Sequence, residues 1–291
     1  MICKLCPRNC GALRTDTEAQ GLCAMPETVY LARAALHRWE EPPISGTRGA
    51  GTVFFSGCNL GCVFCQNDVI SRQRLGKPVT EQRLREIFLE LIEQGAHNID
   101  LVSPTHYAHV LDRVLSEPLP VPVVWNTGGY EKVETLRALE GKVDVYLPDL
   151  KYMDADPAQR YSGAADYPER AKAAILEMVR QTGPVQLDED GILQKGVIIR
   201  HLILPGQVSA AKAVMDWVAE TFPRGTVLFS LMSQYVPLGR AAEFKEIDRA
   251  LRKGEARSAA AYMANLGLAG FTQELDAADA GYVPRFDFSG V

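Results

Sequence analysis

Apolar runs rich in β-branched residues alternate along the chain with segments whose apolar residues recur at helical spacing. The runs predict strands at 51–57, 98–103, 122–127, 143–150, 196–204 and 226–231. Helical patterns lie between them, at 80–95, 105–116, 131–140, 166–182 and 208–222. Most of the runs are apolar enough to be buried on both faces, which is typical of parallel strands connected by helices.

This alternation fits either an open doubly wound sheet or a curved barrel. A GxGxxG turn after the first predicted strand is absent, which counts against a dinucleotide-binding open sheet. We therefore predict an α/β fold, a partial parallel (β/α)6 barrel, over residues 46–240. Residues 1–45 form a small Cys-rich N-terminal segment that ends near Pro42 and Pro43. Residues 241–291 form a C-terminal helical extension with helices at 241–252 and 255–267 and an irregular tail.

Composition narrows the class of protein. The chain has 291 residues, of which 47% are hydrophobic and 23% charged, as in a globular protein with a sizeable core. The net charge of −5 provides no basic footprint, so no nucleic-acid partner is expected. No apolar run reaches the roughly 18 residues that span a bilayer, so no membrane partner is expected. The start MICKLCPRNC has no charged-then-apolar leader, and we expect a cytoplasmic protein.

The cysteines are confined to the first part of the chain. They are Cys3, Cys6, Cys10, Cys23, Cys58, Cys62 and Cys65. A disulfide framework would scatter cysteines through the fold, and an odd number would leave one unpaired. Clustered cysteines in a large cytosolic protein more often bind metal or take part in redox chemistry.

The sharpest motif is Cys58-x3-Cys62-x2-Cys65, directly after the first predicted strand. Three thiolates on one tight loop can hold three corners of a cubane iron–sulfur cluster. The next side chain, Gln66, is a poor fourth ligand, so one iron would stay open to bind a substrate. The alternative is a zinc loop completed by a distant Cys or His.

This motif resembles the cluster motif of the radical S-adenosylmethionine superfamily, including Gly57 before the first cysteine and Phe64 before the last. The resemblance implies a [4Fe-4S] cluster whose open iron is chelated by the amino and carboxylate groups of S-adenosylmethionine. One electron from the cluster then breaks the sulfur–C5′ bond, and the resulting 5′-deoxyadenosyl radical removes a hydrogen atom from the substrate.

Polar residues follow the other predicted strands, where a parallel barrel places its active site. Their order resembles the activating-enzyme branch of that superfamily, typified by the pyruvate formate-lyase activating enzyme, and within it a group with the runs CKLCPRNCG and WEEPPISG. The resemblance implies that Asn126 and Thr127 lie near the cofactor and that Arg200 contacts it. It also implies that Asp149 helps to hold a cation beside the cofactor carboxylate and that Lys151 faces the active site. The alternative for Asp149 is an ion pair with Lys151 or Arg200 at the barrel rim.

The chain departs from that branch in three places. LVSPTHY replaces the Gly-Gly-Glu that receives the methionyl amine, which leaves Ser103 and Thr105 as candidates for that contact. Asn126 replaces an aspartate, so the cation site loses a charge. The run from Ser233 to Tyr235 replaces a histidine on the substrate side. His106 and His201 are further site candidates.

The remaining cysteines form a second set. Cys3, Cys6, Cys10 and Cys23 can close a four-thiolate sphere, which suits a structural zinc or an auxiliary cluster. Free thiols are the third interpretation.

Three functions remain open at this point. The first is a radical enzyme that installs a glycyl radical on a partner enzyme, supplied by an electron donor such as a flavodoxin or ferredoxin. The second keeps the radical chemistry but acts on a peptide, a small metabolite or an RNA base. The third is an iron–sulfur electron carrier. A protein substrate would dock at the open end of the barrel, where we expect the segment 151–196, with Tyr152, Tyr161 and Tyr167, to form one wall.

Overall fold

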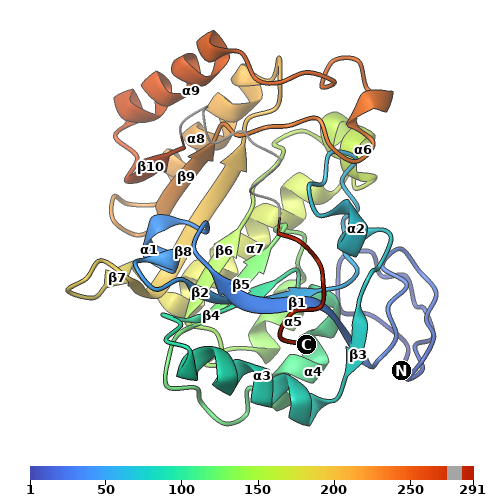
Figure 1. Ribbon diagram of the computed structural model, residues 1–291. Coiled ribbons are helices and arrows are strands. Elements are labelled where there is room, and N and C mark those ends of the chain that lie inside the picture. Colours follow the sequence, from blue (N-terminus) through green and yellow to red (C-terminus); the bar gives the residue numbers. More distant parts are fainter. Residues whose placement is uncertain (274–283) are drawn as a thin grey trace.

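A mostly parallel sheet forms the centre of the protein. The structure is a computed structural model, and it describes residues 1–273 and 284–291. All six predicted strands are present, as β2 (Ala50–Phe55), β4 (Ile99–Val102), β5 (Val123–Thr127), β6 (Val145–Pro148), β8 (Leu193–Leu202) and β9 (Leu228–Met232). They lie side by side in chain order, each parallel to the next, and the sheet curves around its inner face (Figure 1). The predicted α/β fold, a partial parallel barrel, is confirmed.

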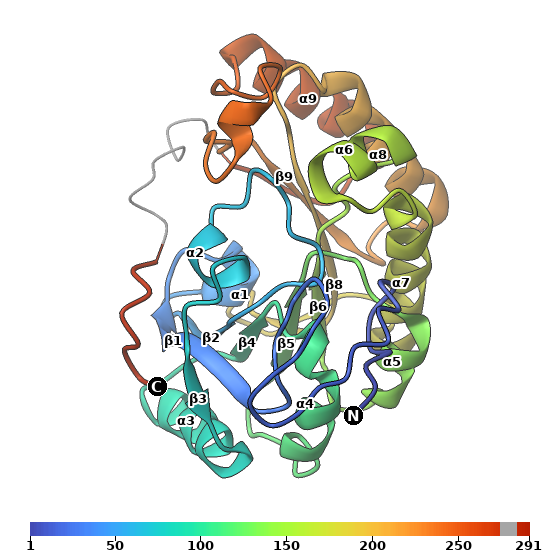
Figure 2. The same ribbon diagram turned by 90° about the vertical axis from the view of Figure 1, so that its right-hand side faces the viewer.

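Helices cover the outer face of this sheet (Figure 2). They are α3 (Glu81–Glu93), α4 (Ala108–Val114), α5 (Val133–Ala138), α7 (Tyr167–Thr182) and α8 (Val208–Thr221), with α9 (Lys253–Leu266) packed on α8. In α3, Thr80 caps the first turn by accepting a hydrogen bond from the Arg83 N–H at 3.1 Å. The same helix buries Leu84 and Phe88, the face that its sequence spacing predicts.

Several elements lie outside the predicted set. The strands are β1 (Val29–His37) and β3 (Lys77–Val79), both antiparallel, the short β7 (Gln186–Leu187), and β10 (Gly270–Thr272), which extends the sheet beyond β9. The helices are α1 (Pro42–Ser45), α2 (Asp68–Ser71) and α6 (Ala155–Ser162). The 3-10 turns η1 (Thr105–Tyr107) and η2 (Ala241–Glu243) lie at the starts of the predicted helices at 105–116 and 241–252. The VYLARAALH sequence of β1 shows no period-two alternation, so its extended form depends on pairing with β2.

The predicted helix at 241–252 is wrong beyond the single turn of η2. Tertiary packing overrides the local helix preference there. Phe244 packs edge-on against Tyr161, with ring centroids 5.6 Å apart, and the Ile247 carbonyl accepts a hydrogen bond from the Tyr235 hydroxyl at 2.9 Å. Leu251 is buried as well. These three side chains reach the core from an irregular backbone, although their i, i+3, i+7 spacing is also that of one helix face, which is why the sequence pattern predicts a helix.

The WEEPPISG run folds into the inside of the barrel. Ile44 of α1 is fully buried among Val124, Leu147 and Ile198, which project from the inner faces of β5, β6 and β8. The Asn98 side chain donates to the Ile44 carbonyl at 2.8 Å. This arrangement brings Glu40 and Glu41, just before α1, into the barrel interior.

The C-terminal residues of the chain pack on β1. Residues 284–291 follow this strand, where the Phe288 N–H donates to the Ala32 carbonyl at 3.1 Å and the Ala34 N–H donates to the Ser289 carbonyl at 2.9 Å. The division into residues 1–45, 46–240 and 241–291 stays a prediction. None of the helices in the described residues is both long enough and apolar enough to cross a membrane.

Candidate active site

The Cys58–Cys65 loop follows β2 at the carboxyl edge of the parallel strands. Each sulfur accepts one hydrogen bond: Cys58 Sγ from the Leu60 N–H at 3.3 Å, Cys62 Sγ from the Ser162 hydroxyl at 3.1 Å, and Cys65 Sγ from the Ser71 hydroxyl at 3.3 Å. The two serines come from α6 and α2, so separate elements fix the loop. Gly57 begins the loop with a φ of 87°, and a Cβ there would lie 2.2 Å from the Met25 side chain. Only glycine fits this turn.

The three thiols interact electrostatically. Burial raises the pKa of Cys65 to about 12, and the neighbouring Cys62 and Cys58 contribute to the rise. Burial also raises the pKa of Cys62, which Lys151 partly offsets. Thiolates in such a place need a compensating positive charge, and iron supplies it. The loop therefore fits an iron–sulfur cluster.

The geometry also bears on the zinc alternative. Among the described residues, no three His, Cys, Asp or Glu side chains are arranged to hold one metal ion. Thiolates of a cubane cluster each bind a different iron, so their sulfurs do not converge on one point.

A layer of charged side chains crosses the barrel interior beside this loop. The Arg200 guanidinium donates to Asp149 at 2.9 Å and to the Asn126 side-chain oxygen at 2.7 Å, and it pairs with Glu40 at 3.3 Å. Asp149 also pairs with Lys151 Nζ at 2.5 Å. Although burial opposes it, the two cations hold the pKa of Asp149 below its ordinary value. The structure thus brings four of the predicted site residues together.

Two buried carboxyl groups in this layer escaped the sequence analysis. Asp100 accepts from the Thr52 hydroxyl at 3.3 Å, and burial followed by the charge of Glu40 raises its pKa well above the ordinary value. Glu41 accepts from the Ser230 hydroxyl at 2.8 Å, and burial raises its pKa to about 7. The adjacent Glu40 and Glu41 before two prolines were a signal that could have placed acids in the barrel.

A third buried carboxyl group, that of Glu131, accepts hydrogen bonds from two of the predicted cofactor-binding residues. The hydroxyls of Thr105 and Thr127 both donate to its Oε1 atom, the former at 2.6 Å, and the Trp125 indole donates at 3.3 Å. Burial raises the pKa of Glu131 to about 7. Ser103, the other candidate, is half-buried at the end of β4 with a φ of 58°, and its N–H donates to the Asn126 carbonyl at 2.8 Å.

Both candidate histidines contact the backbone. His106 Nε2 lies 2.7 Å from the Ser56 carbonyl, and burial lowers its pKa to about 3. His201 Nδ1 lies 2.7 Å from the Leu150 carbonyl, and burial lowers its pKa to about 4. Both rings are therefore neutral at physiological pH, and each hydrogen-bonds a backbone carbonyl just after a strand.

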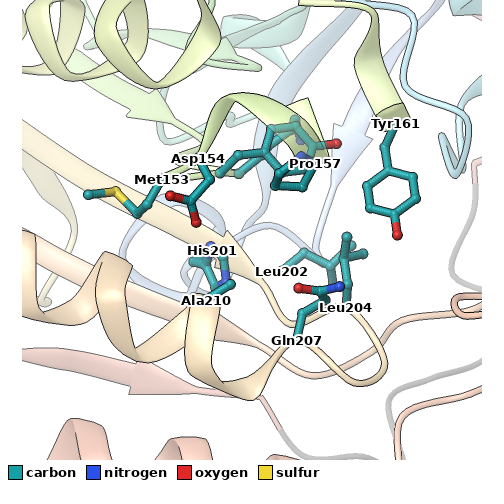
Figure 3. Close-up of a pocket in the computed structure, with 11 residues that line it drawn as sticks. Met153, Asp154, Pro157, Tyr161, His201, Leu202, Leu204, Gln207 and Ala210 are labelled. Atoms are coloured by element: carbon teal, nitrogen blue, oxygen red, sulfur yellow. The ribbon is translucent and has the colours of Figure 1, made fainter. Parts of the chain in front are cut away.

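A pocket that is open to solvent adjoins the charged layer between α6 and α8 (Figure 3). Lys151, Tyr152 and Tyr161 line one side, and His201, Leu204 and Gln207 line the other. Tyr167, the third tyrosine predicted for this wall, instead contacts the Gly128 and Asp149 carbonyls at 2.9 and 2.8 Å. The pocket combines aromatic and aliphatic surface with the charged groups of Lys151 and Asp154.

The fold and the site together define an α/β protein with a partial barrel and a loop of three cysteines at its mouth. Residues 52–218 match the Radical SAM superfamily, and the chain belongs to this superfamily. Its cofactors are accordingly a [4Fe-4S] cluster and S-adenosylmethionine, as the sequence predicts.

Individual proteins are similar over most of the chain. The uncharacterized protein MJ0674 of Methanocaldococcus jannaschii is 30% identical over 267 residues, which cover 88% of this chain and 72% of that protein. SuiB of Streptococcus suis, in a crystal structure bound to S-adenosylmethionine, is 16% identical with a TM-score of 0.55 over 76% of this chain and 50% of SuiB. A radical SAM methyltransferase from Sphaerobacter thermophilus is 16% identical with a TM-score of 0.50, over 80% of this chain and 70% of that one. The structural likenesses show the fold, and the chain spans about half the length of SuiB.

Proposed function

We propose that Cys58, Cys62 and Cys65 bind the [4Fe-4S] cluster and that the chain is an activating-enzyme-like oxidoreductase. When bound, the cluster supplies the electron that cleaves S-adenosylmethionine and so yields a radical able to abstract hydrogen. The observation that carries the proposal is the loop of three hydrogen-bonded sulfurs beside a buried charged layer at one edge of the barrel. The protein supplies orientation and exclusion of water.

The charged layer suits a zwitterionic cofactor. Arg200 and Lys151 provide the cations that a methionyl carboxylate requires, and Asp149 holds both in place. The Asn126 side-chain oxygen accepts a hydrogen bond from Arg200, and its amide adds an uncharged polar group to the layer. Ser103 is our candidate for the methionyl amine, through its hydroxyl or backbone oxygen. Thr105 and Thr127 are our further candidates for cofactor contacts, and both hydroxyls donate to Glu131.

The substrate that we propose is a glycyl-radical enzyme, and the electron donor a flavodoxin or ferredoxin. The order of site residues along the chain, which resembles the activating-enzyme branch, supports this target. The pocket walled by Tyr152 and Tyr161 adds a surface against which an inserted loop can pack. Seven cysteines without a disulfide support a reducing, cytoplasmic setting.

The first experiment tests the chemistry. The reconstituted protein is reduced without oxygen, S-adenosylmethionine is added, and 5′-deoxyadenosine is measured. We expect product from the wild type and from the surface variant Asp16→Ala, and none from Cys62→Ala. An intact cluster that yields no product would refute the enzyme and leave an electron carrier.

The second experiment tests the target. Proteins crosslinked to the chain in cells grown without oxygen are identified, and the partner is examined by electron paramagnetic resonance after reaction. A glycyl radical on the partner is expected. If deuterium from a labelled peptide or small metabolite enters 5′-deoxyadenosine instead, the target is wrong while the radical chemistry stands.

A further inference from the structure

The first 28 residues gather four cysteines in a segment with little regular structure. Its backbone pairing consists of the isolated bridges Ile2–Leu13 and Arg14–Ala19. Within it, the buried apolar side chains are only those of Cys3, Cys6, Pro7, Ala12, Met25 and Pro26. Such a segment buries too little apolar surface to order itself, whereas a bound metal can supply the missing free energy.

The four N-terminal thiols, those of Cys3, Cys6, Cys10 and Cys23, form no disulfide. Gly21 has a φ of 95°, and a Cβ there would lie 3.1 Å from Cys10 Sγ, so the backbone leading to Cys23 passes directly over that thiol. Cys23 lies near enough to Cys3 and Cys10, and Cys6 near enough to Cys23 and Cys3, for their charges to interact. The four thiols are therefore neighbours of one another.

A buried cation faces this set. Arg14 is 2% exposed, its Nη1 lies 4.0 Å from Cys3 Sγ, and its Nε has no hydrogen-bond partner. The guanidinium donates to the His106 and Pro26 carbonyls at 2.5 Å and lies over the Tyr107 ring. Among the described residues, no carboxylate forms an ion pair with Arg14. A buried cation is costly unless an anion compensates it, and metal-bound thiolates would supply that charge.

The turn between Cys6 and Cys10 is hydrogen-bonded to the Cys58–Cys65 loop. The Arg8 side chain donates to the Asn59 and Leu60 carbonyls, at 2.9 and 3.0 Å, inside the Cys58–Cys62 interval. It also donates at 2.8 Å to the carbonyl of Ser162, whose hydroxyl bonds Cys62 Sγ. Figure 2 shows the N-terminal segment, in dark blue, beside α5, where the Thr135 hydroxyl donates to the Leu5 carbonyl at 2.7 Å.

We propose that the four N-terminal thiols bind a second iron–sulfur cluster, joined to the loop of the first by Arg8. We choose a cluster rather than zinc because Arg8 joins this segment directly to the loop and to the serine that contact the first cluster's cysteines, as an electron relay would require. This second site does not depend on the substrate of the proposed enzyme.

Iron, sulfide and zinc are measured per chain in protein purified and reconstituted without oxygen, together with the Mössbauer spectrum. We expect about eight iron atoms in the wild type and in Asp16→Ala, an exposed change in the same segment. The triple variant Cys58→Ala, Cys62→Ala, Cys65→Ala should keep about four iron atoms at the N-terminal site. The double variant Cys6→Ser, Cys23→Ser should keep about four at the first site, and the combined variant almost none.

The triple variant is decisive because it leaves the N-terminal segment unchanged. If it is folded by circular dichroism but holds no iron, or if the wild type holds about one zinc and about four iron atoms, the second cluster is refuted. If instead the double variant is folded without iron, the ligand assignment of the first cluster fails and the second stands.

Discussion

At the scale of single residues, Arg200 is where the polar contacts of the active site converge. Its planar guanidinium touches Asp149, Asn126 and Glu40 at once, from three different elements. A lysine could keep the charge but not the fork of parallel donors. The residue therefore fixes the geometry of the site as well as its charge.

We predict that Arg200→Lys weakens binding of S-adenosylmethionine about tenfold, which corresponds to about 1.4 kcal/mol, because one of the directed hydrogen bonds is lost. The measurement is the cofactor-induced change in the electron paramagnetic resonance spectrum of the reduced cluster, titrated against cofactor concentration. Arg137→Lys, an exposed change on α5, is the control. Unchanged affinity in a variant with full iron content would remove Arg200 from the cofactor site.

The buried Glu131 leads to a prediction on pH. Its folded-state pKa of about 7 exceeds the ordinary value, so the folded protein binds the proton more tightly and its stability falls as pH rises through this window. Glu131→Gln cannot ionise. The free energy of unfolding of the variant relative to the wild type should therefore rise between pH 5 and pH 8, by on the order of 3 kcal/mol.

Denaturant titration of both proteins at the two pH values provides the measurement. Glu189→Gln, on an exposed turn, should show the same difference from the wild type at both. A pH-independent difference for Glu131→Gln would mean that this carboxyl group titrates normally.

At the scale of elements, the short helix α6 joins three parts of the site. Tyr161 lines the pocket, the Ser162 hydroxyl bonds Cys62 Sγ, and the carbonyl of the same serine accepts from Arg8. The helix escaped prediction because its eight residues, which include Pro157, are too few to show a clear helical periodicity. The 241–252 segment shows the converse, since a strong helical pattern there yields to packing around Tyr161 and Tyr235.

Ser162→Ala should make the reduction potential of the first cluster more negative, because a hydrogen bond to a ligand sulfur stabilises the reduced, more negative cluster. The potential is measured by spectroscopic redox titration. Tyr152→Phe keeps the serine donor and loses only its neighbour 2.9 Å away, so a smaller change is expected. Equal potentials in the wild type and Ser162→Ala would show that the Ser162 hydroxyl does not donate to a sulfur of the cluster.

At the scale of the whole molecule, segments that are distant in the sequence fill the interior of the partial barrel and cover a strand edge. The WEEPPISG run fills the interior, and residues 284–291 lie against β1. Phe286 packs edge-on against Phe54 of β2, with ring centroids 5.4 Å apart. The tail thus covers part of the strand edge that the sheet would otherwise leave open.

A chain that ends at residue 283 should be less stable than the full chain, by about 2–4 kcal/mol, because Phe54 loses an aromatic partner and β1 loses two backbone hydrogen bonds. Hydrogen exchange followed by mass spectrometry should show faster exchange in residues 29–37 and unchanged exchange in α8. Uniform protection in both chains would show that the tail contributes nothing.

The sequence by itself determined the parallel strands, most helices between them, and the cysteine spacing, because apolar periodicity and ligand spacing are local properties. Only the tertiary structure decided that Glu41 and Asp100 lie in the barrel, that Thr105 and Thr127 share the carboxyl group of Glu131, and that Arg8 joins the two cysteine sets. Burial and the meeting of distant segments are properties of the whole chain, and no window of sequence contains them.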